Sequence, residues 1–500
     1  MSVSTAVPLT ILHTSDWHLG RRLYGRMRYD EFVTFLNWLA DTIATQQVDV
    51  LIVAGDIFDT MTPSNRAQAL YYEFLGTVSK SCCQHVVIVA GNHDSPTFLD
   101  APSQILKFLN VHVIGTACED VRDEVLILHD SSDLPYCIIA AVPYLRDRDV
   151  RSSGAGESMD SKDANVISGI RAHYDAVAAI AKNHQQVLAK THARHIPIIA
   201  TGHLFAAGGS TTTDDGVRDL YVGNLGKISA EMFSPYFDYV ALGHLHVPQR
   251  VGGREHIRYS GSPIAMGFGE ARQQKQVLLV QFGAAADDVA ALFNSSTSNP
   301  STLNLPPNNK KTAAQKTANH TAASHNFIDD LFGFDDVDNI EVVQNIGSTV
   351  AEVNLLNDDK SQMRVSALPI PCFQPLAQVS GDMQTIKATI CTLTQSRSAS
   401  EPIWLEVVYT GDDIVANLRE QIAAMVDGLS CEILKIKNLS TYNKVLNQES
   451  ASETLQDLNE LEVFERCLLV NEVTDAQKLT LRHAYEQIIH EIYDKDHHAE

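Results

Sequence analysis

Several short apolar runs of this chain end in residues of the kinds that bind metal ions. The groups are Asp16-Trp17-His18, Gly55-Asp56-Ile57-Phe58-Asp59, Gly91-Asn92-His93-Asp94, Gly202-His203 and Gly243-His244-Leu245-His246. In α/β sheets the loops at the carboxyl ends of strands form the ligand site, so these segments are expected to converge on one place. The glycine before four of the groups lets the backbone turn sharply and leaves room for the ligands to approach one centre.

The donor types indicate divalent metal ions. Two carboxylates, one amide and several imidazoles are available: Asp16, His18, Asp56, Asn92, His203, His244 and His246. This mixture suits manganese, iron or zinc, whereas all-oxygen sites favour magnesium and all-thiolate sites favour zinc. There are too many ligands for one ion. Two ions about 3.5–4 Å apart can activate water and clamp both the attacking and the leaving oxygen of a phosphate ester. Asp56 is the natural bridge between them.

Each motif alone also has an ordinary explanation. An Asp-x-His after a strand occurs often by chance. The Asn and His residues of the GNHD and GHLH segments could instead cap local backbone in a turn. The complete set, in a compatible order and with each member at the end of an expected strand, favours a site. A Ser-His-Asp arrangement, a P-loop and a dinucleotide fingerprint are not evident in the sequence.

The elements that must position these residues follow a βα pattern. Strands are expected at residues 9–14, 48–54, 86–90, 196–201 and 239–242, and a helix with one apolar face at residues 29–46. This alternation from Leu9 to Phe282 predicts a layered α/β domain over residues 1–283.

The rest of the chain divides into three parts. Residues 284–345 are of low complexity and are expected to be a disordered insert, either a tolerated surface insertion or an acidic-aromatic docking peptide. Residues 346–440 predict a small α+β domain, with strands at 349–356 and 404–409 and a helix at 413–426. Residues 450–500 carry two amphipathic helices, which pack either on their own chain or on a partner.

Composition restricts the possible functions. The 500 residues include 44% hydrophobic and 20% charged residues, as in a soluble globular protein. The apolar runs are strand-sized, and the N-terminus lacks the pattern of a secretory signal, so a cytoplasmic location with reduced cysteines is expected. The formal net charge of -23 opposes attraction to polyanions and counts against a free-standing DNA binder. This net charge is still compatible with a local basic groove or with a partner that binds the DNA.

The order DxH, GDxxD, GNHD, GH, GHxH resembles that of the calcineurin-like metallophosphoesterases. Within them, the chain is most similar to the nuclease subunits of bacterial nuclease–ATPase complexes, through five stretches: residues 15–20, 55–59, 91–95, 259–264 and 373–376. The likeness runs from about residue 10 to 282 and resumes at about 369, so it leaves out the polar insert. It implies a β-sandwich flanked by helices, a small DNA-capping domain and C-terminal helices that hold a coiled-coil ATPase.

The resemblance also implies an activity. The implied activity is that of a manganese-dependent nuclease. It would act as an exonuclease on double-stranded ends and as an endonuclease on single strands and hairpins, in DNA recombination, repair and replication. The assembly it implies is a heterotetramer that contains a dimer of the nuclease. The alternatives are a phosphatase or cyclic-nucleotide phosphodiesterase with the same metal core, and a non-catalytic adaptor.

For the site, the resemblance divides the ligands between two ions. One would be held by Asp16, His18, Asp56 and His246, and the other by Asp56, Asn92, His203 and His244. His93 would be the catalyst beside the metals, because an imidazole there can stabilise the phosphorus centre and protonate the leaving oxygen.

Other charged residues near the motifs have open roles. Asp59 is a candidate to orient His93, or else it caps the turn at residues 60–63. Arg21, Arg22 and Arg66, together with Arg26 and Arg28, are candidates to contact DNA phosphates, or else they belong to a solvated basic loop.

Overall fold

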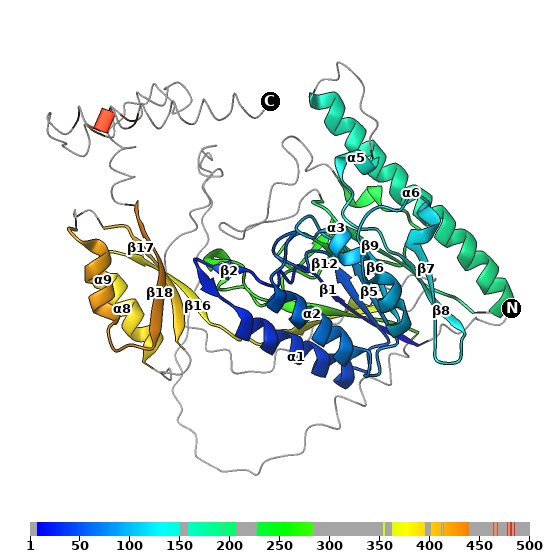
Figure 1. Ribbon diagram of the computed structural model, residues 1–500, viewed down its shortest axis with the longest axis horizontal. Helices are drawn as coiled ribbons and strands as arrows, with labels where there is room; N and C mark the ends of the chain where they lie inside the picture. Colours follow the sequence, from blue (N-terminus) through cyan, green and yellow to red (C-terminus); the bar gives the residue numbers. More distant parts are fainter. Residues whose placement is uncertain are drawn as a thin grey trace, which may run out of the picture. The chain divides into compact units, whose positions relative to one another are not determined.

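A computed structural model shows the arrangement of these elements (Figure 1). It describes residues 8–150, 159–192, 194–206, 228–283, 354–355, 363–395, 402–411, 413 and 415–439, and the single tail positions 464, 468, 478, 481, 482 and 485. The expected insert at residues 284–345 therefore lies outside the described residues.

Two β-sheets form the body of the α/β domain. The first has seven strands in the order β14 (Asn354–Leu355), β15 (Met363–Pro369), β13 (Gln276–Phe282), β1 (Leu9–Thr14), β4 (Val50–Ala54), β5 (His85–Val89) and β6 (Val111–Ile114). The second has six strands in the order β11 (Gln249–Val251), β12 (Arg254–Tyr259), β10 (Tyr239–Gly243), β9 (Ile198–His203), β8 (Pro135–Ala140) and β7 (Val125–His129).

The two sheets share one hydrophobic core. Alternate residues of β4, Val50 and Ile52, are buried in a cluster with Ile139 and Ile199 of the second sheet. The intervening residues of such a strand point to its opposite face, and Leu51 belongs to a different cluster. Because both faces of β4 are buried, its sequence is a continuous apolar run rather than an alternating one.

Helices cover the outer faces of the sandwich. α1 (Tyr29–Thr45) and α2 (Asn65–Val78) share a cluster with the first sheet, and α6 (Met159–His192) shares one with the second. Three short helices lie in the connections: α3 (Pro96–Asp100), α4 (Ser103–Leu106) and α5 (Asp147–Val150). The hairpin β2 (Arg22–Leu23) and β3 (Arg26–Met27) precedes α1. The layers are thus helix, sheet, sheet, helix, as the expected α/β sandwich requires.

The strands that precede the candidate ligands run parallel to one another within each sheet. β1, β4 and β5 are parallel neighbours in the first sheet, and β9 and β10 are parallel neighbours in the second. Parallel strands place their carboxyl ends at the same edge. The loops after these strands therefore meet.

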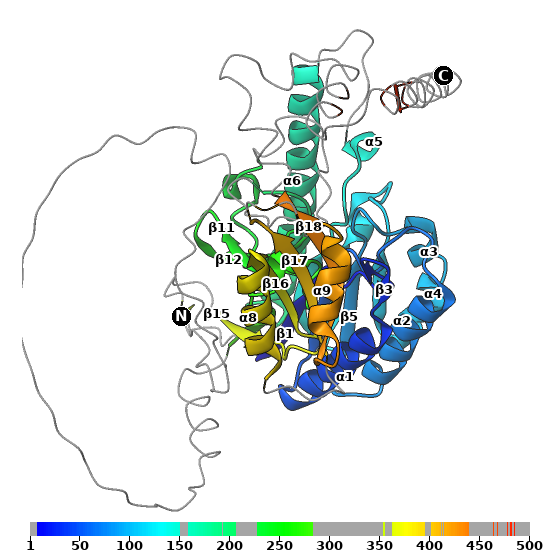
Figure 2. The same ribbon diagram turned by 90° about the vertical axis from the view of Figure 1, so that its left-hand side faces the viewer.

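The C-terminal sheet is a separate βαβαβ unit. Its strands β16 (Leu376–Gly381), β17 (Ile403–Tyr409) and β18 (Cys431–Asn438) are all parallel. The connecting helices are α8 (Met383–Thr394) and α9 (Leu418–Val426), which lie beside these strands in Figure 2. The sequence predicted a small α+β domain here, whereas the structure has parallel strands that alternate with helices. A further difference is that β15 pairs with β13, so residues 363–369 complete the first sheet instead of belonging to the small domain.

Local sequence signals located the elements well. β1 has the expected bounds, β10 extends one residue further than expected, and α1 ends one residue earlier. The two tail helices lie mostly outside the described residues. The tail residues that are described include Phe464 and Tyr485, whose rings stack 3.9 Å apart. None of the described helices combines the length and apolar character needed to cross a membrane.

Candidate metal centre

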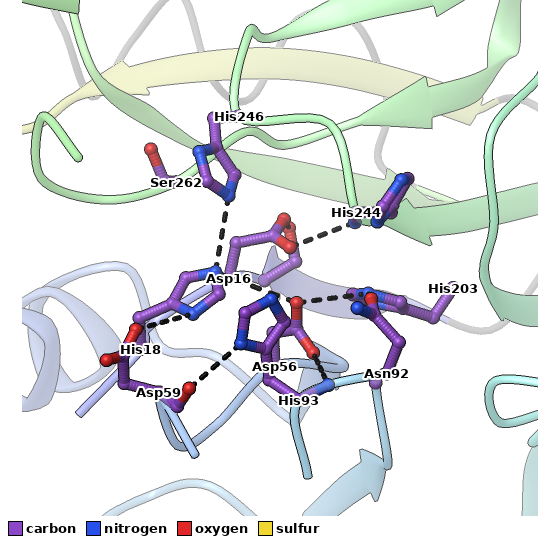
Figure 3. Close-up of polar contacts among 12 residues, drawn as sticks. Asp16, His18, Asp56, Asp59, Asn92, His93, His203, His244, His246 and Ser262 are labelled. Atoms are coloured by element: carbon purple, nitrogen blue, oxygen red, sulfur yellow. Dashed lines mark hydrogen bonds and ion pairs between the residues drawn. The ribbon is translucent and has the colours of Figure 1, made fainter. Parts of the chain in front are cut away.

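The structure brings the side chains singled out by the sequence to one place (Figure 3). Asp16 and His18 follow β1, Asp56 follows β4 and Asn92 follows β5. The second sheet contributes the remaining ligands, of which His203 ends β9 while His244 and His246 follow β10. All of these side chains are buried except that of Asn92, which is partly buried.

The side chains form two groups that meet at Asp56. Asp16, His18 and His246 offer ligand atoms within 4.8 Å of one another, and so do Asp56, His203 and His244. Oδ2 of Asp56 lies 3.6 Å from Nε2 of His18 and 3.3 Å from Nε2 of His203, one residue from each group. One carboxylate oxygen thus faces both groups, as a bridging ligand must.

Further contacts fix the ligand atoms within each group. The Nε2 atoms of His18 and His246 are 3.2 Å apart, and Nε2 of His203 is 3.0 Å from Oδ1 of Asn92. The backbone N–H of His93 donates to Oδ1 of Asp56 at 2.9 Å. This bond leaves the other oxygen of Asp56 directed at the site.

The backbone at the ligands is strained. Four of them adopt positive φ angles: Asp16 at 54°, His18 at 48°, Asp56 at 51° and His244 at 104°. Such conformations cost about 1–3 kcal/mol each for residues other than glycine and persist only where the surroundings enforce them. Here the N–H of His18 donates to the carbonyl of Asp56 at 2.9 Å, and the N–H of His244 donates to Oδ1 of Asp16 at 2.9 Å. The ligand loops hold one another in place.

Two glycines are required by close packing around Asp56. A Cβ atom on Gly55 would overlap the ring of His203, and one on Gly91 would overlap the carboxylate of Asp56. Gly55 also has a φ of 87°, which disfavours any side chain. The room for ligands that the sequence predicted is therefore present at these two positions.

The residues present fit divalent cations. Nε2 of His244 is buried and has no hydrogen-bond partner among the described residues. Burial lowers the pKa of His244 well below its usual value, so its ring is neutral and offers a lone pair. Burial would also lower the pKa of His203, but the charge of Asp56 outweighs it and raises the pKa to about 9. The buried charge of Asp56 therefore draws a positive partner, and a manganese, iron or zinc ion with carboxylate and imidazole donors would supply that charge.

His93 and Asp59 meet in a way that the sequence did not predict. Nδ1 of His93 donates to the backbone carbonyl of Asp59 at 2.8 Å. The Asp59 carboxylate instead accepts from Arg21 at 3.1 Å and lies 3.6 Å from Nδ1 of His18. Burial would raise the pKa of Asp59, but the neighbouring His18 ring and the charge of Arg21 lower it to about 2. Asp59 thus contacts His93 through its main chain, while its side chain supports His18.

The arginines have separate environments. Arg21 is held by Asp59 beside the site, and Arg22 is exposed. Arg66 pairs with Asp30 at 3.2 Å and lies over the ring of Tyr29. Two others are bound within the protein: Arg28 is buried against Glu31, and Arg26 pairs with Glu432 at 2.6 Å. Arg21 is therefore the arginine of this group that contacts a residue beside the ligands.

Asp94 is a supporting residue for which the sequence indicated no role. Its buried carboxylate accepts from the N–H groups of Gly91, Ile57 and Phe58 at 2.8, 3.1 and 2.9 Å. It therefore ties the loop after β4 to the loop after β5. The only signal in the sequence was its place in the GNHD group, because contacts to backbone N–H groups of another loop leave no trace in spacing.

Comparisons with known proteins agree with this geometry. A family model described as calcineurin-like phosphoesterase matches residues 9–248, and one described as type 5 capsule protein repressor C-terminal domain matches residues 372–471. The chain is 32% identical over 485 residues to the SbcD subunit of the nuclease SbcCD from Escherichia coli strain K12, covering 96% of this chain and 98% of that protein.

Shorter alignments give the same protein name. The chain is 36% identical over 277 residues to the SbcD subunit of Bacillus subtilis, covering 54% of this chain and 66% of the relative. It is 34% identical over 291 residues to that of Rhodobacter capsulatus, covering 56% and 67%.

Removing the Asp94 carboxylate tests its role in the ligand loops. Asp94→Ala leaves buried N–H groups without an acceptor, at about 1–3 kcal/mol for each. We expect a loss of at least about 3 kcal/mol in the free energy of unfolding, and a metal affinity lower by about 10–100-fold. Denaturant unfolding and manganese titration measure the two quantities.

The matched control is Asp120→Ala, which removes an exposed carboxylate that accepts from the N–H of Arg122. It should cost less than about 1 kcal/mol and leave metal binding unchanged. Wild-type stability and affinity in Asp94→Ala would show that the loops do not depend on this residue.

Proposed function

The chain belongs to the SbcD family of nuclease subunits, a group of metal-dependent phosphodiesterases with the calcineurin-like phosphoesterase domain, and we propose that it cuts DNA by a two-metal mechanism with manganese. We assign to it exonuclease action on double-stranded ends and endonuclease action on single strands and hairpins. The corresponding processes in the cell are recombination, repair and replication.

One observation supports the two-metal mechanism: Oδ2 of Asp56, which belongs to one ligand group, lies near His203 of that group and also near His18 of the other. Two divalent ions held there would supply a nucleophile at neutral pH and stabilise the charge on the phosphate. We assign Asp16, His18, Asp56 and His246 to one ion and Asp56, Asn92, His203 and His244 to the other. The mixture of oxygen and nitrogen donors supports manganese over magnesium.

The position of His93 supports its proposed role as the proton donor. Its Nδ1 is held by the carbonyl of Asp59, and Figure 3 shows its other ring nitrogen directed toward the middle of the ligand cluster. The carbonyl acceptor requires a proton on Nδ1, so Nε2 is the ring nitrogen left to act on the substrate. In the protonated form Nε2–H would donate to the leaving oxygen of the scissile bond. Asp59 thus acts on His93 through its carbonyl, and its carboxylate orients His18.

The assignment of DNA as substrate is supported by what surrounds the site. The hairpin β2–β3 follows ligand His18 and contacts the C-terminal sheet, where Nζ of Lys435 donates to the hydroxyl of Tyr24 at 2.6 Å. A small-substrate phosphatase needs no such second domain. We propose that strands β16–β18 form the DNA-capping domain, and that Arg21 and Arg22 face phosphates. Because the chain carries a net charge of -23, a partner must share the binding of DNA.

The substrate class is tested with the full chain and manganese on two substrates, a DNA hairpin and a generic aryl phosphodiester. We expect cleavage of both, since the metal core acts on any accessible phosphodiester while the surrounding domains admit DNA. Gel electrophoresis and absorbance measure the two rates, and Asp56→Asn protein is the blank. Hydrolysis of the aryl ester with none of any DNA would instead indicate the alternative, a phosphatase or cyclic-nucleotide phosphodiesterase.

Two substitutions separate the proton donor from the metal ligands. His93→Ala should keep both manganese ions and lower the rate of DNA cleavage by about 10²–10⁴-fold, the range for loss of a general acid. Asp56→Asn should lose bound metal, because it removes the bridging charge. Metal content and single-turnover rates are the measurements. The control His129→Ala changes an exposed histidine outside the site. A near-normal rate for His93→Ala would mean that another group protonates the leaving oxygen.

We propose that the partner is an SbcC-type coiled-coil ATPase, held by the helices at residues 450–500, and that two nuclease copies join in a heterotetramer. The relatives are named as one subunit of the nuclease SbcCD, which supports a complex of this kind. An exposed apolar stretch supports pairing of the copies: Ile105, Phe108 and Leu109 are 72%, 90% and 44% exposed. Such a patch on a soluble protein favours an interface.

Light scattering of the complex copurified with the ATPase gives its mass. The wild type should contain two copies of the nuclease and two of the ATPase, and Phe108→Asp should yield one of each, because a buried unpaired charge opposes the contact. Lys107→Asp, an exposed neighbour, is the control. A mass unaffected by Phe108→Asp would move the dimer contact elsewhere.

We also propose a cytoplasmic location, because DNA is the substrate and the described cysteines are all free thiols. Cell fractionation with an antibody tests this location. We expect the protein in the cytoplasmic fraction, and finding it elsewhere would contradict the proposal.

A further inference from the structure

A buried carboxylate stands behind one of the candidate ligands, outside all the motifs. Glu270 is completely buried, and its Oε1 lies 3.2 Å from Nδ1 of His246. The opposite ring nitrogen of His246, Nε2, faces His18 in the metal site. Glu270 therefore contacts the side of the imidazole that points away from the proposed metal.

The second oxygen of Glu270 is fully engaged. Oε2 accepts from the N–H of Met266 at 2.9 Å, from Oγ of Ser262 at 3.3 Å and from Nζ of Lys275. Lys275 is itself buried and also donates to the backbone carbonyl of His246 at 3.3 Å. The carboxylate is thereby held in one orientation, with Oε1 left for His246.

The turn that carries Glu270 is fixed from outside the site. Glu270 ends the 3-10 helix Phe268–Glu270, and Phe268 is buried in a cluster with Leu23 of the β2–β3 hairpin and with Leu376 and Trp404 of the C-terminal sheet. The ring of Tyr24 stacks on Phe268 at 5.7 Å. This packing restrains the helix and with it the carboxylate.

We propose that Glu270 is a positioning residue that accepts the Nδ1 proton of His246 and so presents the Nε2 lone pair to the metal. A carboxylate behind a ligating histidine fixes its tautomer and ring orientation and raises its basicity. Lys275 does not contact the His246 ring in this proposal; its charge compensates the buried charge of Glu270. The proposal rests on the proposed function, because it takes His246 as a metal ligand.

The test compares two variants of the full chain that both lack the lysine charge. Lys275→Met keeps the bond between Glu270 and His246, and the double variant Glu270→Leu/Lys275→Met removes it without leaving an unpaired buried lysine. Free manganese is counted by electron paramagnetic resonance during titration with manganese alone, so no activity is needed. Thermal melting checks that each variant is folded.

We expect Lys275→Met to bind two ions with nearly wild-type affinities. The double variant should bind one ion normally and the other about 10–100-fold more weakly. This loss at one site only is a result that general destabilisation would not give. Equal affinities in the two variants would overturn the role of Glu270, and so would equal weakening of both ions in the double variant.

The wild type separates this inference from the proposed function. If the wild-type chain binds fewer than two ions, the two-metal proposal fails by itself. If it binds two and the variants match it, only the role of Glu270 fails. Glu231→Gln, an exposed glutamate in the 3-10 helix Ala230–Met232, is a surface control that should leave both affinities unchanged.

Discussion

The buried carboxylate of Asp56 is the constraint around which this structure is organised. Isolating an anion in a protein interior is costly unless positive charge accompanies it. Burial would raise the pKa of Asp56, but the charge of His203 and the nearby His18 ring lower it well below its usual value. Histidine side chains supply this positive charge only when they are protonated. Metal ions would satisfy Asp56 and leave the imidazoles neutral, and this is the physical basis of the proposed function.

The sandwich brings loops of two sheets onto that carboxylate. Strand pairing fixes where β4 and β9 end, and the hydrophobic core between the sheets fixes their separation. Bonds among the loops then hold the positive φ angles of Asp16, His18 and His244. Asp94 supports the site from one side and Glu270 from the other. The site is therefore stabilised by residues that are not among the proposed metal ligands.

Much of this was predictable from the sequence, because the ligand residues lie at strand ends and buried strands are visible as apolar runs. The positions of β1, β10 and α1 were obtained to within a residue. The supporting contacts were not predictable. Asp94, Glu270 and the Asp59 carbonyl act through backbone groups or across long separations, which no local pattern records. The pairing of β15 with β13 was missed because a long polar segment separates them.

The most direct test of the central claim is a crystal of the full chain grown with manganese, measured at a wavelength where manganese scatters anomalously. We predict two anomalous peaks about 3.5–4 Å apart, one on each side of Asp56 Oδ2. One peak would lie among Asp16, His18 and His246, and the other among Asn92, His203 and His244. A single peak at full occupancy, or two peaks that do not share Asp56, would contradict the two-metal site.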